Sequence, residues 1–415
     1  MQSVNLVVRA YRPSVLAGSQ AFAQTVLIAP RIEGAPPSAG AATMVLVVDV
    51  SGSMSVEDKL TNAKAAAAIF VDHLRPGDQM AVVAFDTNAH VVSPMSTSAN
   101  GSSIKAAIAG LEPGGGTMLG LALRAARDLM KGRPAGAAAR VIVLTDGATS
   151  DDSRCEQEAR EAAAERLPIS CYGVGTDWNT ELLTYIAEAT QGRVGNIEDP
   201  STLAARLGGE FRDLQDTALT NAEIVVQPTE GVGVTGLQRV IPDLVPYQLG
   251  TPGSPIAVGD ISRDADTAPQ FLLDLVLPPR PVGPVRAARV LMRYQEVGST
   301  QARETDLMDV VVTYTSDQGQ ASMVDPDIKR LIDLRAANTM VERAIAAANA
   351  GDKAKATTLL TNARQVTQRL GQAQVTTKLD VAIDQLTAGG QLSQDTKTTI
   401  VSGTRRTTEL KPLGE

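Results

Sequence analysis

Two kinds of hydrophobic pattern alternate between residues 43 and 213. Continuous apolar runs, such as Met44–Val48 and Val141–Leu144, are typical of strands that are buried on both faces of a sheet. Helical patterns lie between them, and the first places apolar residues at i, i+3 and i+7 from Leu60 onward. Strands that alternate with helices predict a parallel, Rossmann-like α/β sheet over residues 43–213.

The residues on either side of this segment have a different pattern. Two strand-like runs, Val4–Ala10 and Gln24–Ala29, precede a Pro- and Gly-rich linker from Pro30 to Ala42. Residues 214–325 hold short strand-like runs separated by Pro and Gly, which predicts an all-β sandwich. Because an isolated pair of strands is not stable, we expect residues 1–42 to complete this sandwich. The α/β domain would then be an insertion in it.

The pattern becomes helical again over residues 326–400. Short breaks near Gly351 and Gly389 separate the apolar stripes, which predicts a helical hairpin or small bundle. Residues 401–415 show little periodicity, and we expect a flexible tail. Arg405-Arg406-Thr407 resembles a basophilic kinase site, and Leu410 stands where ligands of forkhead-associated domains carry a hydrophobic residue. This resemblance predicts phosphorylation of Thr407, with a Ser/Thr kinase and a forkhead-associated domain as partners. The alternative is a plain solvated tail.

Three polar loops of the α/β segment carry the candidate chemistry. Asp49-Val50-Ser51-Gly52-Ser53 and Asp146-Gly147 each follow a buried strand, and Gly114-Gly115-Gly116-Thr117 precedes a helix. The carboxyl ends of parallel strands meet at one edge of a sheet, so these loops should lie together. The five side chains concerned are Asp49, Ser51, Ser53, Thr117 and Asp146. Two acids and three hydroxyls suit a hard divalent cation, Mg²⁺ first. The alternative is a set of helix caps that binds nothing.

The order Asp-x-Ser-x-Ser, a later Thr and a later Asp-Gly resembles the metal-ion-dependent adhesion site (MIDAS) of von Willebrand factor type A (VWA) domains. The resemblance covers roughly residues 41–213 and implies a bacterial VWA protein with that site intact. It further implies that Ser51, Ser53 and Thr117 bind the metal directly, while Asp49 and Asp146 act mainly through waters. Neutral ligands leave the charge of Mg²⁺, Mn²⁺ or Ca²⁺ poorly compensated. An Asp or Glu carboxylate of a protein partner can therefore complete the coordination.

Two other functions compete with metal-dependent protein binding. An Asp at a strand end is also where aspartyl nucleophiles lie, so a Mg²⁺-dependent phosphohydrolase is the main alternative. That chemistry usually needs a second direct carboxylate and a lysine. Ser51 stands where the second acid is expected, and no lysine is placed among the three loops. We therefore expect a binding protein and no enzyme. A scaffold with a vestigial metal site is the third interpretation.

Charge and apolar content restrict the location and the partners. The net charge of -8 and the pI near 5.1 argue against nucleic acid as a main partner. No apolar run reaches the roughly 18 residues of a membrane span. Residues 1–6 lack the basic start and apolar run of a signal peptide, so we expect a cytoplasmic protein. Cys155 and Cys171 are expected to be reduced thiols, because a helix of about 12 residues, or about 18 Å, should separate them.

Two further residues belong to the predicted metal edge. Trp178 is the sole tryptophan and follows a predicted strand end. It is interpreted either as an exposed partner contact or as a plug between loop and helix. Asp151 follows Asp146-Gly147 closely. It either adds negative potential beside the metal, as part of the partner-binding surface, or caps the next helix.

Overall fold

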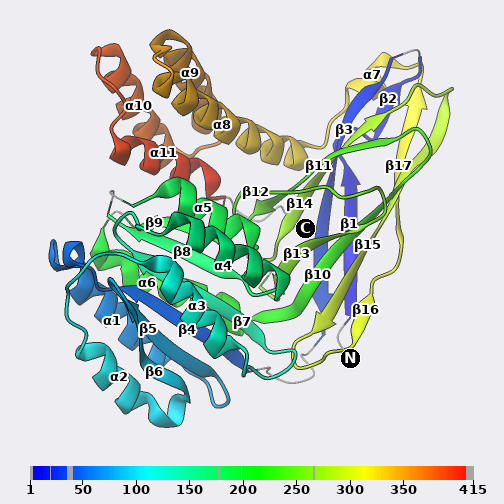
Figure 1. Cartoon of the computed structure of the whole chain (residues 1–415). Coiled ribbons are helices and arrows are strands. Elements are labelled where there is room, and N and C mark those ends of the chain that lie inside the picture. Colours follow the sequence, from blue (N-terminus) through cyan, green and yellow to red (C-terminus); the bar gives the residue numbers. More distant parts are fainter. Residues whose placement is uncertain are drawn as a thin grey trace. The chain divides into compact units, whose positions relative to one another are not determined.

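The computed structural model describes residues 3–18, 20–34, 41–175, 178–197, 199–264 and 267–407 (Figure 1). The chain divides into two compact units. The α/β unit comprises Ser38–Thr220 and Glu296–Gln301. The second unit comprises Met1–Pro37, Asn221–Gln295 and Ala302–Glu415.

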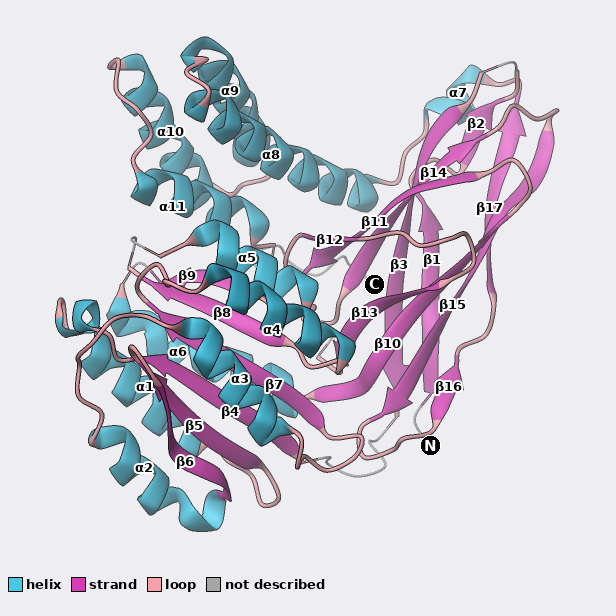
Figure 2. Ribbon diagram, in the orientation of Figure 1, coloured by secondary structure: helices cyan, strands magenta, loops and turns pink. Residues whose placement is uncertain are grey.

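A six-stranded sheet of order β6-β5-β4-β7-β8-β9 forms the centre of the α/β unit (Figure 2). All neighbouring pairs are parallel except the antiparallel pair of β5 and β6. Every residue of β4 and β7 is buried, as their continuous apolar runs predict. The strands are β4 (Ala42–Asp49), β5 (Gln79–Phe85), β6 (Ala89–Thr97), β7 (Ala138–Thr145), β8 (Ile169–Val174) and β9 (Val194–Ile197).

Helices cover both faces of this sheet. One face packs against α1 (Lys59–Asp72), α2 (Gly101–Ala109) and α6 (Leu203–Gln215). The other face packs against α3 (Leu119–Met130), α4 (Asp152–Ala164) and α5 (Thr180–Ala189). Short 3₁₀ turns occupy Gly52–Ser55, Ser98–Asn100 and Pro200–Thr202. The predicted Rossmann-like α/β domain is confirmed. The chain leaves β4 toward one face and β7 toward the other, so these neighbours flank a topological switch point, where ligands of such sheets bind.

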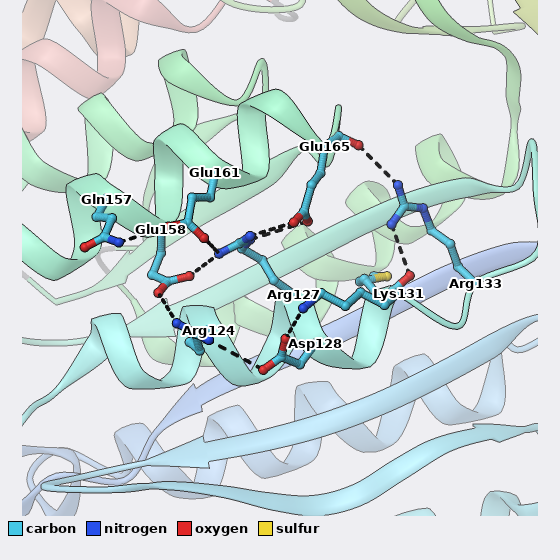
Figure 3. Close-up of polar contacts among 10 residues, drawn as sticks. Arg124, Arg127, Asp128, Lys131, Arg133, Gln157, Glu158, Glu161 and Glu165 are labelled. Carbon is cyan, nitrogen blue, oxygen red and sulfur yellow. Dashed lines mark hydrogen bonds and ion pairs between the residues drawn. The ribbon is translucent and has the colours of Figure 1, made fainter.

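An ion cluster joins α3 to α4, the two helices that follow the candidate metal loops (Figure 3). The guanidinium of Arg127 lies at its centre and donates hydrogen bonds to Glu158, Glu161 and Glu165. The side chains of Arg127 and Glu158 are only 7% and 3% exposed. Burial alone would lower the pKa of Arg127, but the three glutamates outweigh it and raise that pKa.

A second buried ion cluster joins α6 to the face of the sheet that α1 and α2 also cover, opposite to α3 and α4. Arg140 Nη1 lies 2.7 Å from Glu210 Oε1, and Arg193 Nη1 lies 3.1 Å from Glu210 Oε2. The hydroxyls of Ser170 and Tyr172 each donate to Glu210 at 2.8 Å. Burial alone would raise the pKa of Glu210, but the two arginines and the two hydroxyls lower it well below its usual range.

Two sheets make up the β part of the chain. One has the order β1-β3-β14-β11-β12, and the other has the order β13-β10-β15-β17-β2, with β16 paired to β15. The strands before the α/β unit pair with strands after it, since β3 pairs β14 and β2 pairs β17. The second sheet is mixed, because β2 runs parallel to β17. The bounds are β1 (Ser3–Ala10), β2 (Ser14–Leu16), β3 (Phe22–Glu33), β10 (Thr217–Pro228), β11 (Gly233–Ile241), β12 (Val245–Tyr247), β13 (Pro255–Ser262), β14 (Gln270–Leu277), β15 (Gly283–Glu296), β16 (Ala302–Glu304) and β17 (Met308–Thr315).

The linker expected from Pro30 begins later than predicted. The strand β3 continues to Glu33, and Pro30 is paired with Leu6 of β1. Proline lacks only its own N–H, so a strand can include it where no ladder bond needs that donor. Residues 35–40 lie outside the described residues.

The C-terminal helices agree with the predicted helical region. After the short α7 (Gln318–Ser322) come α8 (Pro326–Asn349), α9 (Lys353–Arg369), α10 (Ala373–Thr387) and α11 (Gln394–Arg405). Leucine, valine and alanine side chains of α8, α9 and α10 share one core with Leu392 and Ile400. The start of α8 packs Ile328, Leu331 and Leu334 against strands of the first sheet.

The flexible-tail prediction is wrong for residues 401–407. The helix α11 continues to Arg405, and Arg406 forms an antiparallel bridge with Asp243. Thr407 is fully buried, and its hydroxyl donates to the carbonyl of Val240 at 2.6 Å. Its amide donates to the carbonyl of Pro242 at 3.1 Å. A kinase cannot reach this hydroxyl, which removes the basis for the kinase and forkhead-associated partners. Leu410 lies outside the described residues.

Candidate metal centre

Asp49 ends β4 with both carboxylate oxygens engaged. Oδ1 accepts a hydrogen bond from the Ser51 amide at 2.8 Å, and Oδ2 accepts one from the Thr145 hydroxyl at 2.6 Å. The side chain is fully buried. Burial raises the pKa of the Asp49 carboxyl above its ordinary value, against the lowering effect of these bonds. Asp49 therefore holds the loop after β4 in place from beneath it.

The two serines connect Asp49's loop to the end of β7. Ser51 Oγ and Ser53 Oγ lie 3.1 Å apart, and Ser53 Oγ donates to Asp146 Oδ1 at 2.7 Å. Ser51 and Asp146 are buried, whereas Ser53 is exposed. The structure thus brings four of the five predicted ligands together in one chain of hydrogen bonds, with Ser53 at the solvent side.

The glycine loop lies against the same site. The Gly114 amide donates to the carbonyl of Val50 at 2.7 Å, and the Gly52 amide donates to the carbonyl of Gly115 at 3.3 Å. Gly115 has φ of +74°, and a Cβ there would lie 3.0 Å from the Thr87 hydroxyl, so only glycine fits without strain. Gly115, which contacts the loop after β4, precedes Thr117 by two positions, so these contacts hold the backbone of Thr117 near that loop.

Thr117 has a hydroxyl that remains available. The residue is half-buried, and its carbonyl accepts bonds from the Ser150 amide at 2.9 Å and the Thr149 hydroxyl at 3.1 Å. Among the described residues, none hydrogen-bonds to the Thr117 hydroxyl. A hydroxyl that is held in place by its own backbone and has no protein partner suits metal coordination.

Lys59 is the site residue that sequence reasoning missed. Its Nζ donates to Asp146 Oδ2 at 3.0 Å, and the two side chains are 8% and 0% exposed. The three loops themselves contain no lysine, as stated from the sequence, but the side chain of Lys59 reaches them from the following helix. Lys59 follows Asp49 by ten positions and begins α1, which places it outside the loop but above the same sheet edge. The one signal available was a lysine at a helix start, where the helix dipole disfavours a cation.

The oxygen donors fit a hard divalent cation. Within the described ranges no group of three or more His, Cys, Asp or Glu could hold a metal. The site therefore offers two acids and depends on hydroxyls for its remaining ligands. The open rim of Ser53, Gly115 and Gly116 leaves such an ion accessible to solvent.

Trp178 is a plug and no exposed partner contact. The side chain is only 3% exposed, and its Nε1 donates to Asn196 Oδ1 at 3.0 Å. The indole covers Gly173 so closely that a Cβ there would lie 2.1 Å from the ring. A loop after a strand end can fold inward over a glycine, and burial of a large apolar ring favours that position.

Asp151 also has a structural role, although not the expected one. Its Oδ1 accepts hydrogen bonds from the Gly120 amide at 3.1 Å and the Thr149 hydroxyl at 2.6 Å. It makes no side-chain cap bond to α4. The carboxylate thus caps α3, the helix before it in the chain, where the helix dipole favours an anion.

The two cysteines are free, as predicted, and serve as packing residues. Cys155 and Cys171 are free and buried in the core shared by α3, α4 and α5. Burial raises the pKa of both thiols, which keeps them protonated and unreactive.

Among the described residues, none of the helices combines the length and apolar character that a bilayer span requires.

Comparisons with known proteins agree with this fold. Residues 44–148 match the family model of the von Willebrand factor type A domain, and residues 326–410 match that of the Sll0103-like C-terminal alpha-helical domain. The chain is 28% identical to the uncharacterized protein sll0103 of Synechocystis over 374 residues, 87% of each chain. It is 25% identical to the uncharacterized protein YfbK of Escherichia coli over 193 residues, which span 45% of this chain and 34% of YfbK. The structure of a von Willebrand factor type A protein from Catenulispora acidiphila shares the fold over 98% of both chains, with a TM-score of 0.83 at 20% identity.

Proposed function

Because this chain contains a von Willebrand factor type A domain, we propose that it binds a protein partner through a divalent cation, Mg²⁺ first and Mn²⁺ or Ca²⁺ as alternatives. Ser51, Ser53 and Thr117 would hold the ion directly. Asp49 and Asp146 would act from behind them. The bound ion supplies a Lewis-acid position that an Asp or Glu of the partner can occupy.

The observation that carries this proposal is the chain of contacts from Ser51 through Ser53 to Asp146. Thr117 follows Gly115 by two positions, and the Gly115 carbonyl contacts the same loop. In a merely structural set of caps, each hydroxyl would bond to a helix amide. Here Ser51 makes no such bond to the turn that follows it, and the Thr117 hydroxyl bonds to no helix amide among the described residues. Ser51 and Ser53 point instead toward each other and toward an acid.

Titration calorimetry with Mg²⁺ tests the metal. We expect one ion per chain, and we expect Ser53→Ala and Thr117→Ala to weaken binding at least tenfold without lowering the melting temperature in chelator. Ser55→Ala is the matched control, because that exposed hydroxyl is bonded to the Gly52 carbonyl in the same turn. Equal affinities in the wild type, Ser53→Ala and Thr117→Ala would refute the ligand assignment.

Affinity capture tests the partner. The full-length protein should retain a binding protein in Mg²⁺ and release it in chelator, and Thr117→Ala should retain none. Substitution of each acidic residue on the captured protein should then identify the carboxylate that reaches the ion. A partner that binds equally in chelator would contradict the metal-dependent mechanism.

Lys59 is a specific observation in favour of the Mg²⁺-dependent phosphohydrolase as a second candidate, because it supplies the lysine that this chemistry needs. Against it, both oxygens of Asp49 already accept hydrogen bonds and the side chain is fully buried, so it is poorly placed to attack phosphorus. Phosphate release from p-nitrophenyl phosphate in Mg²⁺, abolished by Asp49→Asn, would establish the hydrolase instead.

Two further features belong to this proposal. We regard the two sheets of the second unit as a β-sandwich into which the VWA domain is inserted, and the pairing of β3 with β14 and of β2 with β17 supports this.

We also place the protein in the cytoplasm, in a signalling or assembly role. The two free, buried thiols are consistent with a reducing compartment.

A further inference from the structure

Lys59 occupies a position that its own helix does not favour. It is the first residue of α1, where the exposed amides already carry partial positive charge. The two residues before it, Glu57 and Asp58, both have φ of 55°, the left-handed region that residues with side chains rarely adopt. A lysine at this place, after such a turn, needs a stabilising partner elsewhere.

The side chain of Lys59 is built into the metal edge. Its ammonium bonds to Asp146 Oδ2 at 3.0 Å while Ser53 bonds to Oδ1 of the same carboxylate at 2.7 Å. Its stem passes the end of β8, where a Cβ on Gly175 would lie 3.3 Å from Lys59 Cε. Gly175 has φ of +83° and therefore both turns the chain and leaves room for the lysine. The ion pair is buried, unlike a surface pair.

The charges of the site can be counted from these residues. When Asp49 and Asp146 are both ionised, they carry two negative charges, and the ammonium of Lys59, which pairs with Asp146, reduces the total to one. A divalent cation would change this total from one negative to one positive charge. A single carboxylate from a partner then brings the site to neutrality. Without Lys59, the cation alone would neutralise the site, and the partner's carboxylate would be in excess.

We propose that Lys59 is a built-in counter-cation that weakens metal binding and strengthens the binding of an anionic ligand to the loaded site. The ammonium stabilises Asp146 when no metal is bound, so the edge of the sheet needs no metal to stay folded. It also leaves the loaded site with an uncompensated charge for a carboxylate. This inference rests on the proposed function, since it concerns the same metal.

The test uses the full-length protein with Mn²⁺ as the metal and acetate as the carboxylate probe. Lys59→Gln keeps a hydrogen-bond donor and removes the charge, Lys59→Met removes both, and Lys59→Arg keeps the charge. Lys131→Met is the matched control, because this exposed lysine follows α3 at its far end and pairs with Asp128. Calorimetry measures Mn²⁺ affinity, and the relaxation rate of water protons reports displacement of Mn²⁺-bound water by acetate.

Lys59→Gln should bind Mn²⁺ about tenfold or more tightly than the wild type, because one positive charge beside the ion is removed. Acetate should displace water from its bound Mn²⁺ several times less effectively. Lys131→Met should match the wild type in both measurements, and Lys59→Arg should lie closer to the wild type than Lys59→Gln does in both. In chelator, Lys59→Met should melt at a lower temperature than the wild type.

The outcomes separate this inference from the proposed function. Equal or weaker Mn²⁺ affinity in a folded Lys59→Gln protein would overturn the inference alone. Absence of Mn²⁺ binding in the wild type and in every variant would overturn both. Binding by Lys59→Gln but not by the wild type would support the counter-cation and overturn metal-dependent binding as the natural function.

Discussion

Replacement of Arg127 by methionine tests how firmly α3 and α4 hold the loops of the candidate site. Arg127 and Glu158 are 7% and 3% exposed, and removal of one member of a buried pair costs about 3–5 kcal/mol. Glu161 and Glu165 are 41% and 32% exposed, so solvent screens them and the loss of their contacts adds little. Methionine fills the space of the arginine stem. We therefore expect the free energy of unfolding of the α/β unit to fall by about 3–5 kcal/mol.

Urea unfolding followed by fluorescence measures this change. Trp178 is the only tryptophan, and it lies in the same core as α3 and α4, so its emission reports this unit. Arg124→Met is the control, because Arg124 is 59% exposed and 3.9 Å from Glu158, and it should cost about 1 kcal/mol or less. Mg²⁺ affinity should stay unchanged, since Arg127 lies eight helical residues, or about 12 Å, beyond Leu119, where α3 begins after the Thr117 loop. A loss below about 1 kcal/mol in Arg127→Met would refute the argument from burial.

Three more predictions follow from the fold. Glu210→Gln should destabilise the protein by about 3–5 kcal/mol at pH 7, and this difference should shrink below pH 4.5. Folding lowers the pKa of Glu210, so the stabilisation it provides is present above the unfolded value of 4.5 and is lost as the pH falls toward the folded value. A pH-independent difference in urea unfolding would contradict this. Gly173→Ala should shift the Trp178 emission to longer wavelength and cost about 1–3 kcal/mol or more, because the new Cβ would lie 2.1 Å from the indole; unchanged emission would show that the ring adapts in place. A fragment of residues 41–213 should fold alone, whereas residues 215–325 should not, because they lack β2 and β3, which pair β17 and β14; cooperative melting of the second fragment would exclude this dependence.

The parts of the molecule that periodicity determines were predictable. Apolar runs located β4 and β7, because a strand buried on both faces is a nearly continuous apolar run. The ends of these runs then located Asp49 and Asp146. The helical stripes located α8 to α10 for the same reason, since their buried faces consist mainly of leucine, valine and alanine. Local sequence thus decides an element when one face of that element is apolar.

The helix α11 shows the limit of that rule. Its buried positions include Thr396, Thr398 and Thr404, which a search for apolar stripes does not count. Thr404 can be buried because its hydroxyl donates to the carbonyl of Ile400 at 2.9 Å and meets Asn338 Oδ1 at 3.0 Å. A threonine that satisfies its hydroxyl in this way contributes its methyl group to the core. Polar composition therefore did not mean exposure, and the expected tail is packed as far as Thr407.

Distance along the chain explains the remaining errors. Lys59 and Asp146 are 87 residues apart, and Thr407 and Val240 are 167 apart. A polar side chain becomes buried only when its partner is present, so its exposure depends on a residue that no local pattern identifies. The grouping of the candidate metal ligands could be predicted because three separate strand ends and loops each carry the same kind of oxygen donor. Lys59 had no such repetition, although its ammonium lies 3.0 Å from Asp146 Oδ2. In this site, donors that recur at strand ends could be predicted from sequence, whereas the charge that balances them depended on the fold.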